Sequence, residues 1–223
     1  MTIRSKCAVA VATGILCLPT IFVCSIRGLA QSVQPTEKTV QLSRQSVTAP
    51  VIVSTVTLNG VAITPGKPFV ADDDWLKNMT IVITNRSPKT IVDGWLLLAL
   101  PETGDGTRTN PEIAQQIQFG QLPESARHTA SGKTLDPSFY EPMSLSPHQQ
   151  LTIPLAPFVA TLRRNVETKG SFSAVSTILV QLSVFYFNDD TKWDNGTYEK
   201  PDPDHVGRYL RIPYWEFTGD QNH

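Results

Sequence analysis

The chain has 223 residues, with 19 lysines and arginines against 20 aspartates and glutamates, which gives a net charge of −1 at pH 7. This balance lacks the basic excess that proteins use to bind nucleic acid or anionic membrane surfaces, so neither is expected as a partner. All three cysteines lie near the N-terminus, at Cys7, Cys17 and Cys24. The sequence after them therefore contains no disulfide and no thiolate metal site.

The first 30 residues follow the order of an export signal. Arg4 and Lys6 make a positive start, an uncharged run extends from Cys7 to Ile26, and the small residues Gly28 and Ala30 follow it. This order is typical of a secretory signal that is cleaved after a small residue. We therefore predict a signal peptide over residues 1–30 and an exported protein, located in the periplasm, at the cell surface or outside the cell.

Two alternatives to cleavage stay open. An uncharged run of this length is also long enough to cross a bilayer, which would make the N-terminal segment an anchor and the only membrane contact. Pro19 favours cleavage, because it interrupts a helix near the end of the run. Cys24 suggests lipid attachment, but the bulky Val23 precedes it, where such sites have a small residue.

The remaining chain begins with a polar stretch and then changes to short strand-like segments. Residues 31–50 are weakly patterned and predict a flexible spacer. After them, β-branched and alternating apolar residues recur between turns rich in Pro, Asn and Gly. These segments predict strands over residues 51–58, 79–84, 90–100, 113–119, 149–155 and 176–187, a hairpin return at 191–193 and a last short strand at 211–217.

Three segments stand out from this pattern. The strand at 90–100 is apolar on both faces, which predicts a central position, and Asp93-Gly94 within it predicts a bulge. Within residues 101–148, the stretches 101–111 and 121–148 contain several prolines and predict loops on either side of the strand at 113–119. Phe158, Leu162 and Val166 recur every four residues before Gly170, which predicts one amphipathic helix.

About seven short strands with a single helix, and no alternation of strands and helices, predict an all-β protein with an antiparallel β-sandwich. The predicted domain covers residues 51–217, and residues 218–223 form a tail. Trp95 is a candidate for a core position between the two sheets.

No catalytic constellation is visible in the sequence. The four histidines (His128, His148, His205 and His223) do not have the H-E-x-x-H spacing of metalloproteases. The sequence also contains no G-x-S-x-G motif, which carries the nucleophile in many hydrolases. We predict a protein that is not an enzyme, with no catalytic residues and no cofactor. A site assembled from distant residues stays open as an alternative.

Acidic residues gather in three places, at 72–74, at 189–194 and at 202–204. Sandwich loops with several carboxylates sometimes hold Ca²⁺, but none of these groups has the spacing of a calcium-binding loop. Aspartate is also favoured in turns, where its side chain bonds the nearby backbone. We therefore predict no metal site.

Aromatic residues are concentrated near the C-terminus, between Phe185 and Phe217. Such rings either fill a core or form a platform that stacks on sugars or anchors a partner protein. Phe185 and Phe187 share one face of a strand while Tyr186 takes the other, so at least one set is buried. If a ligand platform exists, its candidate residues are Trp193, Tyr198 and Trp215.

The C-terminal part also carries a resemblance. The run Phe187-Asn188-Asp189-Asp190-Thr191-Lys192-Trp193, followed by Gly196, Tyr198, Pro201-Asp202-Pro203 and Gly207-Arg208-Tyr209, resembles the ending of exported bacterial proteins without an assigned activity. Residues 85–91 similarly resemble the first hairpin of such proteins. The resemblance implies an immunoglobulin-like sandwich and an exported bacterial setting. Where the pattern has glycine in the acidic turn, this chain has Asp190.

These observations lead to two hypotheses for function. The first is an exported, non-enzymatic interaction or structural module that holds an unknown protein partner on a strand edge or through loops near Trp193. The alternative is a carbohydrate-binding module that uses the C-terminal aromatic cluster.

Overall fold

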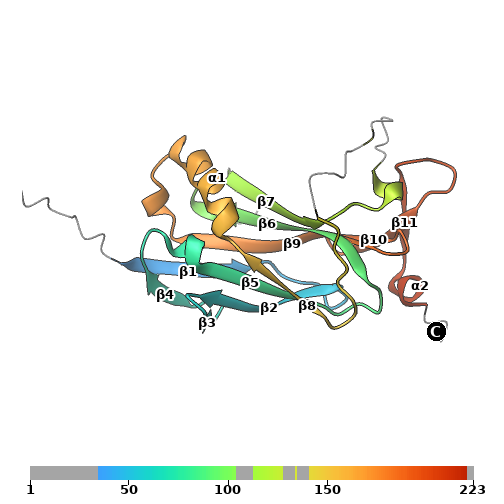
Figure 1. Cartoon of the computed structure of the whole chain (residues 1–223), viewed down its shortest axis with the longest axis horizontal. Helices are drawn as coiled ribbons and strands as arrows, with labels where there is room; N and C mark the ends of the chain where they lie inside the picture. The colour runs from blue at the N-terminus through green and yellow to red at the C-terminus, as the bar shows by residue number, and fades with distance from the viewer. Residues whose placement is uncertain (1–34, 104–112, 128–133, 135–140, 220–223) are drawn as a thin grey trace, which may run out of the picture. The chain divides into compact units, whose positions relative to one another are not determined.

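The computed structural model describes residues 35–103, 113–127, 134 and 141–219. The predicted signal peptide at 1–30 and parts of the predicted loop region at 101–148 lie outside the described residues. Everything described belongs to one unit of contacts, Val33–His223. Its elements are mostly strands, which are arranged in two sheets (Figure 1).

The smaller sheet is built around an alternating strand, β5 (Met79–Asn85), whose Met79, Ile81 and Ile83 are buried. The alternation predicted for this segment is confirmed. Its four strands are all antiparallel and lie in the order β3 (Val61–Ile63), β2 (Val51–Leu58), β5 and β8 (Gln150–Pro154).

The larger sheet has eight strands centred on the longest one, β9 (Thr177–Phe187). One edge of β9 pairs with β6 (Ile91–Leu100), which pairs in turn with β7 (Ile113–Gly120). The central place predicted for residues 90–100 is confirmed, as is the bulge, because the register with β9 shifts between Ile91 and Asp93. The sheet also contains β1 (Thr36–Leu42), β4 (Pro68–Ala71), β10 (Lys192–Asp194), β11 (Thr197–Pro201) and β12 (Tyr209–Ile212).

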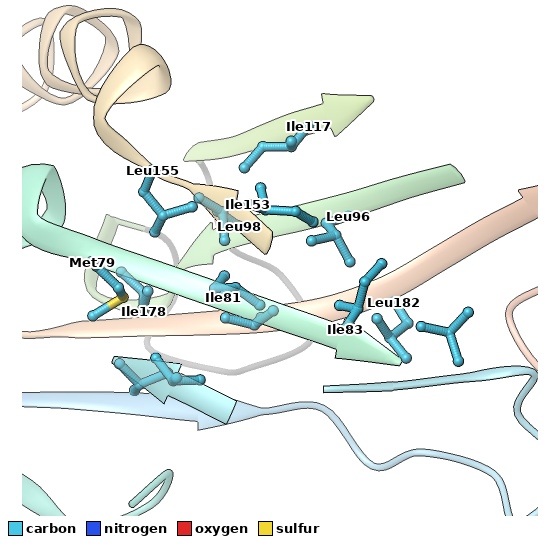
Figure 2. Close-up of a cluster of buried hydrophobic side chains, with 14 of the residues drawn as sticks. Met79, Ile81, Ile83, Leu96, Leu98, Ile117, Ile153, Leu155, Ile178 and Leu182 are labelled. Atoms are coloured by element: carbon cyan, nitrogen blue, oxygen red, sulfur yellow. The ribbon is translucent and has the colours of Figure 1, made fainter. Parts of the chain in front are cut away.

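The core lies where the apolar faces of both sheets meet. Figure 2 shows side chains of β5 and β8 together with those of β6, β7 and β9 in one cluster. The ten labelled residues are Met79, Ile81, Ile83, Leu96, Leu98, Ile117, Ile153, Leu155, Ile178 and Leu182. Trp95 is not part of this cluster, because it alternates with Leu96 and therefore faces away from the core. Trp75 is a fully buried tryptophan of the core instead.

The described residues contain two α-helices. The longer, α1 (Ala156–Glu167), confirms the predicted amphipathic helix, with Val159, Leu162 and Val166 buried. The second, α2 (Tyr214–Thr218), replaces most of the strand predicted at 211–217. The strand β12 ends at Ile212 because Pro213 follows it, and Gly219 closes α2 in the left-handed conformation. Neither helix, nor any other in the described part of the chain, is long and apolar enough to cross a bilayer.

The spacer predicted at 31–50 is wrong over residues 36–42, because β1 lies there and pairs with both β4 and β9. The alternation of apolar and polar residues does not predict this strand, because one of its core-facing residues is the lysine Lys38, which is almost fully buried. The Lys38 Nζ donates to the carbonyl oxygen of Val175 at 2.9 Å and lies 3.9 Å from a carboxylate oxygen of Asp73.

The strand count and the pairing also differ from the prediction. The described residues contain twelve strands where about seven are predicted, because several are short strands of three to five residues. The pair β1–β9 is parallel, so the larger sheet is mixed rather than purely antiparallel.

Candidate functional site

The second edge of β9 is shared by two different strands. Its first part, Thr177–Val180, pairs with β1, and its last part, Val184–Tyr186, pairs with β10. Between these ladders, β1 has already left the sheet and β10 has not yet joined it. A cleft of about 720 Å³ opens at this position. Its lining includes Trp193, one of the residues singled out from the sequence.

The cleft has apolar walls and a polar rim. The apolar residues come mainly from β6 and β9 and include Leu97, Ala99, Leu179 and Leu182. The rim consists of the segment 43–46 after β1 and of Asn195-Gly196 in the turn between β10 and β11. Such a combination of apolar lining and a few amide and hydroxyl groups is typical of binding pockets.

Both sides of the rim are tied to the backbone of β9. The Ser43 N–H donates to the carbonyl oxygen of Val180 at 2.9 Å, and the Asn195 N–H donates to that of Ser183 at 3.0 Å. The side-chain amide of Gln181 donates to the Asn195 side-chain oxygen at 3.3 Å. The cleft is therefore held open by hydrogen bonds that belong to the fold.

The far end of the rim segment is fastened by Tyr198. Its hydroxyl donates to the carbonyl oxygen of Thr48 at 2.5 Å, and the Thr48 hydroxyl lies 2.9 Å from that of Ser46. Burial raises the pKa of Tyr198, so the phenol stays protonated and remains a donor. Tyr198 thus positions the cleft rim from the core side and does not offer its ring to a ligand.

The platform predicted from Trp193, Tyr198 and Trp215 is not formed by these three rings together. Trp193 and Tyr198 are directly opposite each other on β10 and β11, and each is only 4% exposed. Trp215 lies on α2 and is 47% exposed. Because opposite residues point to the same face of a sheet, the pair shares the core face with Phe185, which Trp193 contacts at 5.8 Å between ring centroids.

The neighbouring row of the same sheet is polar. Asp93, Tyr186, Lys192 and Glu199 lie opposite one another on four successive strands. The Lys192 Nζ is 3.0 Å from a Glu199 carboxylate oxygen and lies over the ring of Tyr209 at 4.4 Å. Burial raises the pKa of Asp93 to about 6, with hydrogen bonds from Gln118 and Trp95 opposing the shift. Asp93 is wholly buried, so its carboxyl does not meet a ligand from solution.

The acidic groups act mainly in turns and ion pairs. Asp74 pairs with Arg163 at 2.6 Å and with Lys77 at 3.0 Å, and Asp189 pairs with Lys89 at 2.5 Å. His205 lies 2.9 Å from an Asp202 carboxylate oxygen in an exposed turn. Within the described ranges, no group of three or more histidine or carboxylate side chains is arranged to hold a metal ion. His128 and His223 lie outside those ranges.

The acidic turn at 188–191 holds Asp190 in a backbone conformation that favours glycine. Asp190 has a φ of 65°, in the left-handed region that glycine adopts most readily. Aspartate tolerates this region better than most residues. The turn also contains Asp189, whose carboxylate accepts the Thr191 hydroxyl at 2.6 Å.

The sequence pattern predicts neither the cleft nor the burial of the Asp93 carboxyl group. The available signal for the cleft is that residues 90–100 are apolar on both faces, so one apolar face remains after the core is filled. Leu97 and Ala99 lie on that second face. No family model, no curated protein and no solved structure matches the chain.

Proposed function

We propose that this chain is an exported, non-enzymatic protein whose immunoglobulin-like domain binds a polypeptide partner at the cleft beside Trp193. The observation that carries the proposal is the cleft itself, which combines leucine side chains with amide and hydroxyl groups on the divided edge of β9. An apolar side chain of the partner fills the leucine-lined space, and its backbone bonds to the rim.

The strand order supports the immunoglobulin-like part of the proposal. Such a domain places strands A, B and E in one sheet and C′, C, F and G in the other. In the smaller sheet, β2, β5 and β8 lie side by side in the order of strands A, B and E. In the larger sheet, β7, β6, β9 and β10 lie in the order of strands C′, C, F and G. The order of these strands along the chain also agrees with the lettering. The additional strands extend the edges of this arrangement.

The chemistry of the lining supports binding rather than catalysis. The thirteen described residues around the cleft contribute leucine, alanine, serine, amide, arginine and tryptophan side chains, but neither a carboxylate nor an imidazole. General acid–base catalysis most often uses carboxylate or imidazole groups. Export is supported by the charge pattern of residues 1–30, in which Arg4 and Lys6 precede the uncharged run.

The binding test uses residues 31–223 as bait in a peptide display selection, with affinities of selected peptides measured by calorimetry. Ser43→Trp fills the cleft from its half-buried rim, and Leu97→Gln makes its wall polar. Ser173→Trp, at an exposed serine outside the cleft, is the matched control. We expect both cleft variants to lose at least tenfold in affinity and the control to bind normally; equal binding by all three would reject the cleft as the site.

Export is tested separately by expressing the full chain in a bacterial host and sequencing the N-terminus of the protein recovered from the periplasm. The expected terminus is Gln31, after cleavage at Ala30. Recovery of only the unprocessed chain in the cytoplasm would reject export.

A further inference from the structure

Two turns and the helix α2, which come from distant parts of the chain, meet at a second hollow. None of the residues that line it also lines the cleft. Arg86, Ser87 and Pro88 come from the β5–β6 turn, His148 comes from the turn before β8, and Tyr214, Thr218 and Gly219 come from α2 and its end. The hollow has a volume of about 420 Å³. Its position depends on contacts between residues more than 60 positions apart.

Asn85 holds the first two turns together from beneath. Its side chain is fully buried, and its amide nitrogen donates to the carbonyl oxygens of Lys89 and Leu145, each at 2.8 Å. The carbonyl oxygen of Asn85 accepts the His148 N–H at 2.8 Å. One buried residue therefore sets the spacing between the turn that carries Arg86 and the turn that carries His148.

The turn at residues 85–89 is itself closed by side-chain hydrogen bonds. The Asn85 side-chain oxygen accepts the N–H of Ser87 at 2.9 Å and its hydroxyl at 2.7 Å. The Arg86 N–H donates to the carbonyl oxygen of Pro50 at 2.7 Å. The backbone at Arg86 is thus fixed while its side chain is exposed.

Aromatic packing adds the helix α2. Tyr214 lies 5.5 Å from Tyr198 between ring centroids, and Phe217 stacks on Tyr198 at 4.1 Å. Lys89 lies over the Phe217 ring at 4.3 Å, which connects α2 to the β5–β6 turn. Tyr214 remains about half exposed, so one part of its ring is available to a ligand.

The lining of this hollow has an unbalanced charge. Arg86 makes no ion pair or side-chain hydrogen bond with any other residue that the structure describes, and neither does the imidazole of His148. None of the described residues that line the hollow carries a carboxylate. A guanidinium with five donors and no acceptor matches a carboxylate in a bidentate geometry.

We propose that this hollow binds the carboxylate of an acidic sugar ring, a hexuronate. Arg86 pairs with the carboxylate, His148 donates a hydrogen bond to it or to a neighbouring hydroxyl, and the exposed part of Tyr214 packs on the apolar face of the ring. A polar, open lining with one aromatic face suits a sugar better than an apolar peptide side chain, because little of it is hydrophobic.

The test titrates residues 31–223 with a galacturonate trisaccharide and, in parallel, with the neutral galactose trisaccharide, followed by NMR and calorimetry. We expect binding of the acidic sugar with shifts at Arg86 and Tyr214, and at least about tenfold weaker binding of the neutral sugar, because the charge-assisted pair is lost. Equal binding of both sugars, or no binding of the acidic one, overturns the proposal.

Variants locate the contact. Arg86→Gln is expected to weaken binding about tenfold and Tyr214→Ala about fivefold. His148→Asn tests the imidazole while keeping a side chain that tolerates the φ of 64° at this position. Arg211→Gln and Trp215→Ala, an exposed arginine and an exposed aromatic outside the lining, should bind within about twofold of wild type. Loss of binding in these two controls but not in Arg86→Gln would overturn the assignment.

Other anions serve as further arms of the titration. Inorganic phosphate and a short peptide with a free C-terminal carboxylate are added to the same sample. Preference for either over the acidic sugar, with dependence on Arg86, would overturn the sugar assignment. A folding control by circular dichroism and thermal melting accompanies each variant, and the sugar comparison on wild type stands even if one variant fails to fold.

Discussion

The side-chain amide of Gln118 donates a hydrogen bond of 2.8 Å to the carboxylate oxygen Oδ1 of Asp93, on the neighbouring strand. Asp93 is completely buried, and it is one of very few charged residues in that condition. Burial raises its pKa from 3.8 to about 6, because a charge is costly to remove from water, and the Gln118 amide offsets only part of this shift. The ionised form of Asp93 therefore opposes folding.

We expect Asp93→Asn to stabilise the protein above pH 6. With a folded pKa above the unfolded one, the folded state binds more protons between pH 4 and 6, so stability falls as pH rises through that range. This pKa shift lowers the free energy of unfolding of the wild type by up to about 3 kcal/mol at pH 7. The variant does not have this loss, because asparagine carries no charge. Urea denaturation at several pH values measures the difference between variant and wild type, which should shrink towards zero near pH 4.

Asp189 provides the opposite case. Burial alone would raise its pKa, but hydrogen bonds from Lys89 and Thr191 outweigh this effect and hold the pKa below 3.8. The ionised Asp189 carboxylate therefore contributes to the free energy of unfolding at neutral pH, and this contribution is lost as the pH falls through the pKa of the folded state. Asp189→Asn should therefore destabilise the protein at pH 7 and have less effect in acid. Parallel pH profiles for the two variants would contradict both assignments.

Lys38 links β1 to the segment just before β9. Its Nζ donates to the carbonyl oxygen of Val175, and its side chain is 1% exposed. Lys38→Met keeps the aliphatic stem but removes the donor, so we expect a loss of about 2 kcal/mol in the free energy of unfolding. Lys77→Met changes a half-exposed lysine that pairs with Asp74 at the surface and should cost less than about 0.5 kcal/mol. Equal losses would mean that the Lys38 contact is unimportant.

Gly120 and Gly66 both have positive φ, of 84° and 80°, but they differ in their surroundings. A Cβ at Gly120 would lie 2.1 Å from the carbonyl oxygen of Val92, whereas none of the surrounding atoms lies within 4 Å of a Cβ at Gly66. Gly66→Ala should therefore cost about 1 kcal/mol, from backbone strain alone. Gly120→Ala must also displace the backbone of β6 and should cost several times more. Thermal melting of both variants tests the ranking, and a similar loss in the two would refute it.

The parts of the fold that could be predicted are those with a strong local pattern. In β5, Met79, Ile81 and Ile83 alternate with more exposed residues, and the strand has nearly the predicted bounds. The helix α1 likewise follows from apolar residues spaced along one face. In both elements, the residues that face the core are apolar, so sequence pattern and burial agree.

The parts that could not be predicted depend on long-range pairing. The strand β1 buries Lys38, a residue type that local patterns place at the surface, and its burial depends on the distant partners Val175 and Asp73. The cleft exists because β1 and β10 use the same edge of β9, which no local pattern encodes. The aromatic residues were ambiguous for the same reason, since the burial of Trp193 depends on its position opposite Phe185.

Tyr198 connects the aromatic core to the rim of the cleft. Its hydroxyl donates to the carbonyl oxygen of Thr48, while its ring stacks on Phe217. Tyr198→Phe retains the ring and removes only the hydrogen bond, so we expect a loss of about 1 kcal/mol in stability. Because that bond fastens the segment 43–48, its backbone amides should also exchange with solvent faster.

The matched control is Tyr214→Phe, which removes the hydroxyl of a half-exposed tyrosine in the same aromatic group. It should change stability by less than about 0.5 kcal/mol and leave exchange in the rim segment unchanged. Hydrogen exchange followed by mass spectrometry compares the two variants under identical conditions. If Tyr198→Phe leaves the rim as protected as in wild type, the cleft is not held open from the core, and peptide affinity at the cleft should then be insensitive to Tyr198.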